Sequence, residues 1–138
     1  LLVIGSGALW GETILYSMCI LEEMQWKRTR YITSHDFFHG TLELLEPGVP
    51  VFLFKGEDEC RELDNRVEAF LRSGVTGDED YVIFDTAEFA IPGLDPDFRV
   101  IVSPWILTVC ITDRLSRHYE MVTKHNLKYR RYYHQFDY

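Results

Sequence analysis

The feature that most constrains this fold is an alternation of short, continuously apolar runs with longer stretches of helical periodicity. A strand that is apolar at every position is typical of a parallel sheet covered by helices on both faces. Such runs predict five strands, at Leu1–Ile4, Tyr31–Thr33, Pro50–Lys55, Tyr81–Asp85 and Phe98–Val102. Helices are expected at about Leu9–Trp26, Glu59–Leu71 and Trp105–His125, with a short one within Phe37–Leu45. Right-handed crossovers then give a three-layer, doubly wound α/β domain with a five-stranded parallel sheet.

The charge of the chain is unevenly distributed. Its 138 residues carry a formal net charge of -8, which disfavours nucleic acid and an anionic membrane as partners. From Arg114 onward, however, six Lys/Arg residues stand against two Asp/Glu, a net charge of +4 that leaves -12 on the rest of the chain. This basic end either docks on the acidic body or brings cations to an anionic substrate.

Cysteine usage and apolar patterning indicate a cytoplasmic protein. The three cysteines lie far apart, without a C-x-x-C pair, which fits a reducing compartment and argues against disulfides or a zinc site. The longest uncharged apolar stretch, Thr13–Leu21, is too short to cross a bilayer, and no signal peptide is visible. Because the chain begins inside an expected buried strand, at Leu1, we expect a fragment of a larger protein. Residues 1–126 would form its domain and residues 127–138 a C-terminal tail.

The loops after the first three strands are the expected place for a ligand, because ligands of such sheets bind beyond the carboxyl ends of the strands. These loops are Gly5–Leu9, Ser34–Gly40 and Lys55–Glu57. Gly5-Ser6-Gly7 joins a strand to a helix, and small residues there let backbone N–H groups approach an anion. With Gly11 the loop loosely resembles a dinucleotide fingerprint, and a tight turn without a ligand explains it equally well.

Two polar clusters could supply acid–base groups. His35, Asp36 and His39 fall within Ser34–Gly40, where a histidine could act as acid or base near neutral pH or merely cap the next helix. A metal site is not expected, because no further ligands converge in the sequence. The Glu22–Glu23 pair near the end of the first long helix opposes the helix dipole, and a solvated helix face accounts for it on the residues alone.

Three segments, taken together and in order, resemble the bacterial fructosamine-6-phosphate deglycases. Glu22–Trp26 is similar to the E-M-Q-W segment of that family, and Ser34–Glu43 is similar to its S-G-E-F-F-H-G-P-F-E segment. The ending Arg130–Tyr138 is similar to its R-R-Y-Y…Y tail. The resemblance covers essentially the whole chain, aligned with the second of the family's two sugar isomerase (SIS) halves, and it implies an SIS domain.

The resemblance also implies an activity and residue roles. In that family, and in the related isomerase domain of glucosamine-6-phosphate synthase, a glutamate and a histidine 16 positions later form the acid–base pair, and Glu23 and His39 match these positions. The implied reaction cleaves a 6-phosphorylated fructosamine or glucosamine-type amino-acid adduct to a hexose 6-phosphate and a free amino acid, without a metal or organic cofactor. A homodimer or higher oligomer is implied as well, since the neighbouring subunit contributes the histidine in the synthase.

Further residues are expected to contact the sugar phosphate, although the isolated fragment is expected to be inactive. The residues expected to bind substrate are Gly5, Ser6, Gly7, Ser34, His35 and Arg131. An aminosugar-phosphate isomerase and a non-catalytic sugar-phosphate sensor remain alternatives, but a sensor needs no acid–base pair. The sequence departs from the family at Lys27–Arg30, which is basic where several relatives carry I-H-S-A. This basic segment fits either an acidic amine portion of the substrate or an exposed turn.

Overall fold

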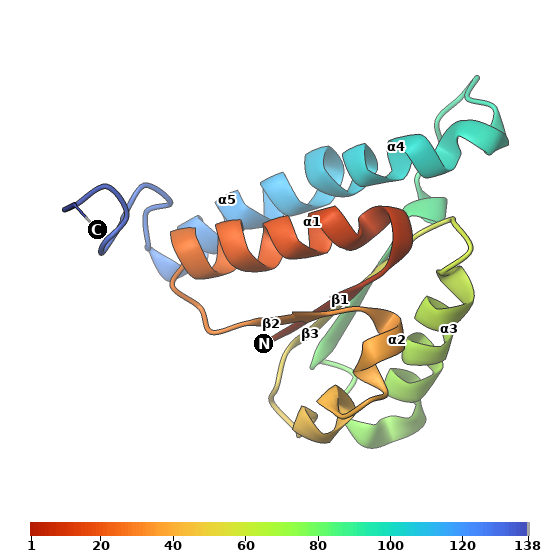
Figure 1. Cartoon of the computed structure of the whole chain (residues 1–138), viewed down its shortest axis with the longest axis horizontal. Coiled ribbons are helices and arrows are strands. Elements are labelled where there is room, and N and C mark those ends of the chain that lie inside the picture. Colours follow the sequence, from red (N-terminus) through yellow and green to blue (C-terminus); the bar gives the residue numbers. More distant parts are fainter. Residues whose placement is uncertain (138) are drawn as a thin grey trace.

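A parallel sheet with helices on both faces forms the centre of the molecule (Figure 1). The computed structural model describes residues 1–137; Tyr138, the last residue of the expected tail, lies outside the described residues. The sheet has four strands in the order β2-β1-β3-β4, all of them parallel. The strands are β1 (Leu2–Gly5), β2 (Arg30–Ile32), β3 (Val51–Lys55) and β4 (Tyr81–Asp85).

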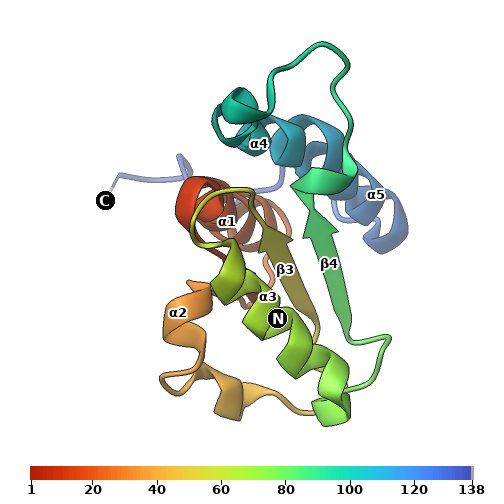
Figure 2. The same ribbon diagram turned by 90° about the vertical axis from the view of Figure 1, so that its right-hand side faces the viewer.

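Two long helical rods cover one face of the sheet and shorter helices cover the other (Figures 1 and 2). The first rod is α1 (Trp10–Ile14), which continues as a π-helical segment, Leu15–Met24. The second joins α4 (Arg99–Trp105), a π-helical segment Ile106–Thr112 and α5 (Asp113–Thr123). The opposite face carries α2 (Ser34–Phe37) and α3 (Arg61–Phe70), which is extended by Leu71–Val75. Short 3₁₀ turns lie at Gly7–Leu9, Thr41–Leu44, Thr86–Glu88 and Pro96–Phe98.

The core is divided by the sheet because neighbouring strand residues point to opposite faces. One buried cluster packs under α2 and α3 and consists of Leu2, Ile4, Phe37, Val51, Leu53, Val67 and Leu71. The other packs under the long rods and consists of Val3, Leu9, Tyr16, Leu21, Phe54, Leu107 and Ile111. The two central strands, β1 and β3, are thus buried on both faces as expected, whereas the edge strands are partly exposed.

The prediction of a fifth strand at Phe98–Val102 is wrong. This segment ends a 3₁₀ turn and begins α4, so the expected helix starts well before Trp105. Asp95 caps the turn by accepting a hydrogen bond from Asp97 N, and Pro96 follows it at the first helical position. Pro104 lies inside α4, where it can donate no backbone hydrogen bond, and the Ser103 hydroxyl donates to Val100 O instead.

The expected short helix within Phe37–Leu45 is divided into two turns, α2 and Thr41–Leu44, by a bend at Gly40 with a φ of 137°. Within residues 1–137, no helix is long and apolar enough to cross a membrane.

Candidate active site

The loops at the carboxyl edge of the sheet converge as expected, but they converge on a buried carboxyl group. Ser34 N donates to Ser6 Oγ at 2.8 Å, and the Ser34 hydroxyl donates to Asp64 Oδ1 at 2.5 Å. Gly56 N donates to Asp64 Oδ2 at 3.2 Å. Burial raises the pKa of Asp64 to about 6, and the two hydrogen bonds offset this shift only in part. Ser6 and Ser34 therefore tie α2 and α3 to the end of β1.

The glycine loop after β1 holds an anion from its own chain. Ala8 N donates to Asp58 Oδ2 at 2.5 Å, and Cys60 N donates to Oδ1 of the same carboxylate at 2.8 Å. Gly7 has a φ of 54°, and a Cβ atom at this position would lie 2.2 Å from Asp58 Oδ2. The backbone is thus shaped for an anion, and Asp58 supplies it. Substrate binding by Gly5, Ser6 and Gly7 stays a prediction.

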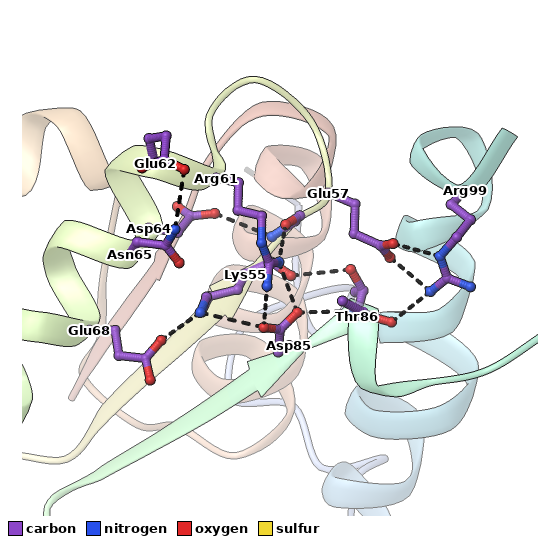
Figure 3. A network of polar contacts seen from close by, with 12 residues as sticks. Lys55, Glu57, Arg61, Glu62, Asp64, Asn65, Glu68, Asp85, Thr86 and Arg99 are labelled. Atoms are coloured by element: carbon purple, nitrogen blue, oxygen red, sulfur yellow. Dashed lines mark hydrogen bonds and ion pairs between the residues drawn. The ribbon is translucent and has the colours of Figure 1, made fainter. Parts of the chain in front are cut away.

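The third loop, at the end of β3, belongs to a set of ion pairs that joins β3, β4, α3 and α4 (Figure 3). Arg61 makes a bidentate pair with Asp85, at 2.9 and 2.6 Å, and Lys55 lies 3.4 Å from the same carboxylate. Arg99 makes a second bidentate pair with Glu57, at 2.5 and 2.9 Å, and its hydrogen bonds hold the pKa of that carboxyl below its usual value. These side chains link four elements of the fold.

The two histidines after β2 lie together on the surface. The rings of His35 and His39 are 4.9 Å apart, and His35 Nδ1 lies 3.2 Å from Asp36 Oδ1. Hydrogen bonding by Thr33, with a smaller effect of His35, lowers the pKa of Asp36. His39 lines a cavity of about 500 Å³ beside the edge strand β2, together with Arg30 and Asp36.

Glu23 lies at the opposite edge of the sheet, where the strands begin. The first helical rod runs back along the sheet, and the turn after it touches the residue before β1, with Leu1 N donating to Arg28 O at 3.4 Å. Glu23 lines a cavity of about 630 Å³ between this turn and the C-terminal tail. Arg130 Nη2 in the tail lies 2.9 Å from Glu23 Oε1, and both side chains are partly buried.

The two residues that follow the first helical rod, Gln25 and Trp26, contact the end of α5 and the tail, which Figure 1 shows beyond the end of that rod. Gln25 is buried, donates to His125 O at 3.2 Å and accepts from the Thr123 hydroxyl at 3.3 Å. The Trp26 ring contacts the His125 ring edge-on at 4.4 Å, and the Arg131 guanidinium lies 4.1 Å from the Trp26 ring centroid. The residues that carry the first motif therefore dock the residues that carry the third.

The structure thus groups the expected site residues into three places. Ser6 and Ser34 meet at the carboxyl edge, Glu23 and Arg131 share the large cavity, and His39 lines a different cavity with no contact to Glu23 among residues 1–137. Sequence reasoning missed the roles of Asp58 and Asp64, which no spacing signals. The described part of the chain has no group of three or more His, Cys, Asp or Glu residues placed to hold a metal ion.

Known proteins of similar sequence are deglycases. The chain is 31% identical over 137 residues to the fructosamine deglycase of Bacillus subtilis, matching 96% of this chain and 39% of that protein. It is 32% identical over 113 residues to the fructoselysine 6-phosphate deglycase of Escherichia coli, matching 82% of this chain and 31% of that protein. The chain therefore spans about two fifths or less of the length of these relatives. No protein-family model matches it.

The chain also matches solved structures in fold. A crystal structure from Bacillus subtilis, described as a candidate phosphosugar isomerase, matches the whole chain with a TM-score of 0.93 at 28% identity. A second, from Salmonella typhimurium, matches 99% of the chain with a TM-score of 0.89 at 30% identity. The chain covers 41% of each. By sequence, the chain is therefore a homologue of part of the fructosamine and fructoselysine 6-phosphate deglycases, and its fold is that of part of the solved phosphosugar isomerase structures.

Proposed function

We propose that the protein containing this chain is a deglycase that splits a 6-phosphorylated fructosamine into a hexose 6-phosphate and a free amino acid. The observation that carries the proposal is the position of Glu23, whose carboxylate lines the large cavity and is held there by Arg130 at 2.9 Å. The names of the similar proteins, fructosamine deglycase and fructoselysine 6-phosphate deglycase, supply the substrate class.

Glu23 would act as the base. The open form of the substrate is a 1-amino-2-ketone, whose C1 proton is acidified by the adjacent carbonyl. A carboxylate that removes this proton gives an enaminol, protonation at C2 gives an imine, and water hydrolyses the imine to hexose 6-phosphate and amine. A single ion pair to Arg130 fixes the orientation of the carboxylate, which is what general-base catalysis requires.

His39 would assist ring opening and relay the second proton. Within one chain it lines a separate cavity from Glu23, so the pair needs an arrangement in which a neighbouring subunit presents its histidine. This supports the proposal of a homodimer or higher oligomer with sugar phosphate as its ligand. The steps proposed here require neither a metal nor an organic cofactor, and a reducing cytoplasm suits the three free cysteines.

The test is release of glucose 6-phosphate by the full-length protein from a panel of 6-phosphofructose–amino acid adducts. Glu23→Gln and His39→Asn should each lower kcat by a factor of about 10² to 10⁴, because each removes a proton-transfer group. Arg72→Gln, which removes an exposed cation from the opposite face of the sheet, should leave the rate unchanged. If no adduct yields glucose 6-phosphate, the deglycase proposal fails and a non-catalytic sugar-phosphate sensor or an aminosugar-phosphate isomerase becomes the better explanation.

A further inference from the structure

The cavity that contains Glu23 carries a surplus of positive charge, although the chain as a whole carries -8. Four cationic and two anionic side chains line it, namely Lys27, Arg28, Arg130 and Arg131 against Glu22 and Glu23. The cations come from two segments, the turn after the first helical rod and the C-terminal tail. Two like-charged segments that face one cavity repel each other. An anion bound between them would lower this repulsion.

The two carboxylates of the cavity, Glu22 and Glu23, neutralise only part of this positive charge. Arg130 pairs with Glu23, and Glu22 accepts a hydrogen bond from the Thr29 hydroxyl at 2.5 Å. Within residues 1–137, neither Lys27 nor Arg28 forms an ion pair. Lys27 Nζ lies 5.4 Å from the Tyr119 ring centroid. The backbone carbonyl of Arg28 accepts a hydrogen bond from Leu1 N.

Arg131, in the tail, also has no carboxylate partner in the described part of the chain. Its guanidinium stacks on the Trp26 ring. Stacking leaves the edge of a guanidinium available for hydrogen bonds to an oxyanion. Lys27, Arg28 and Arg131 thus offer three cationic donors around one space, which is a fitting arrangement for carboxylate groups.

We propose that Lys27, Arg28 and Arg131 form a subsite for carboxylates of the amine portion of the substrate, and that they make the enzyme prefer amino acids with an acidic side chain. This inference rests on the proposed function. Glu23 would act at C1, the carbon that bears the amine, whereas the phosphate is attached at the other end of the hexose. The groups closest to Glu23 are therefore those of the amino acid, so the surrounding cations face its carboxylates.

The preference is measured with two adducts of nearly equal shape, 6-phosphofructose–aspartate and 6-phosphofructose–asparagine, which differ by one negative charge. With the full-length protein, kcat/KM for glucose 6-phosphate release should be at least about tenfold higher for the aspartate adduct, the size of one charge-assisted hydrogen bond. The ratio should shrink as salt is added, because the charges are partly exposed.

The variant Lys27→Gln/Arg28→Gln should lower kcat/KM for the aspartate adduct more than for the asparagine adduct and bring the ratio close to one. Arg72→Gln removes one cation elsewhere on the surface, serves as the control for each single variant, and should preserve the ratio. If the double variant does not fold, each single variant should show part of the loss, since both residues lie in a turn outside the core.

Three results would overturn the assignment or its basis, and they are distinguishable. A wild-type ratio of one or below, with glucose 6-phosphate formed, refutes the subsite and leaves the deglycase proposal standing. An equal loss for both adducts in the double variant assigns these cations to the phosphate and refutes their role in amine selection. Failure of both adducts together with lysine and glycine adducts refutes the deglycase proposal itself.

Discussion

Replacement of Asp64 by asparagine removes a proton-binding group that folding forces into the interior. The Asp64 side chain is fully buried between α3 and the loops at the carboxyl edge. It accepts hydrogen bonds from the Ser34 hydroxyl and from Gly56 N. Burial opposes its ionisation more strongly than these bonds favour it, and the pKa of Asp64 rises to about 6.

The sign of the effect follows from proton binding. An aspartate in an unfolded chain has a pKa of about 3.9, so between about pH 4 and pH 6 the folded state holds a proton that the unfolded state has lost. The stability that Asp64 contributes is complete below pH 4 and is lost as the pH rises through the folded pKa. A difference of about two pKa units corresponds to about 3 kcal/mol. Asparagine does not titrate, so the variant keeps this free energy at higher pH.

The measurement is urea unfolding of the full-length wild type and the Asp64→Asn variant at several pH values from about 4 to 7.5. Relative to the wild type, the variant should gain about 3 kcal/mol in its free energy of unfolding over this range. The asparagine side chain has one oxygen and one NH₂ group to present to two donors, the Ser34 hydroxyl and Gly56 N. This mismatch does not depend on pH, so it shifts the variant's free energy of unfolding by the same amount at every pH. Curves that run parallel within about 1 kcal/mol would show that Asp64 titrates normally in the folded state and would refute the argument.

Further substitutions test the other polar contacts. Arg61→Met leaves Asp85 without its bidentate partner and should cost about 2 kcal/mol at neutral pH in urea unfolding. Because the pKa of Asp85 is lowered in the fold, this loss should diminish as the pH falls below about 4. Gly7→Ala should cost at least about 1 kcal/mol, and Asp58→Ala in the same chain should recover part of it if the clash with the carboxylate is the cause. Gln25→Ala removes two hydrogen bonds to the end of α5 and should make trypsin cleave the tail severalfold faster; an unchanged cleavage rate would mean that the tail is held elsewhere.

Four of the five expected strands could be read from the sequence because each is a short apolar run that ends at a polar or glycine residue. β1 and β3 illustrate the reason: both are buried on both faces, so apolar residues run without interruption through Leu2–Ile4 and Val51–Phe54. The register and the strand order depend on packing between distant segments, and the sequence alone suggested only that the strands are parallel.

The failure at Phe98–Val102 shows the limit of the same signal. A run of five residues with four apolar members fits a strand and a helix equally well. The signals that favour the helix lie upstream, where Asp95 and Pro96 begin a 3₁₀ turn, and in a tertiary contact, the ion pair of the Arg99 side chain with Glu57. The tertiary contact that selects the helix lies 42 positions away in sequence, beyond the reach of a local pattern.

For the site, the general rule about parallel sheets pointed to the carboxyl edge, whereas Glu23 was identified only through a motif. The chemistry of the described residues explains the difference. At the carboxyl edge, Asp58 accepts a hydrogen bond from Ala8 N in the glycine loop, Asp64 accepts one from the Ser34 hydroxyl, and Asp85 pairs with Arg61. An incoming phosphate or carboxylate would have to displace a carboxylate that is already hydrogen-bonded.

The amino edge has the opposite balance, because the cations of the turn and the tail outnumber the carboxylates there. An anionic substrate gains more binding free energy from donors that lack a partner than from donors already bonded to a carboxylate. To use the latter it would have to displace that carboxylate, which would lose its hydrogen bonds. The cationic donors of the proposed subsite, which have no carboxylate partner among residues 1–137, line the same cavity as Glu23, the carboxylate proposed as the base. Charge and orientation therefore favour the proposal that the reaction takes place at the edge where the strands begin, where Arg130 pairs the basic tail with the proposed base, Glu23.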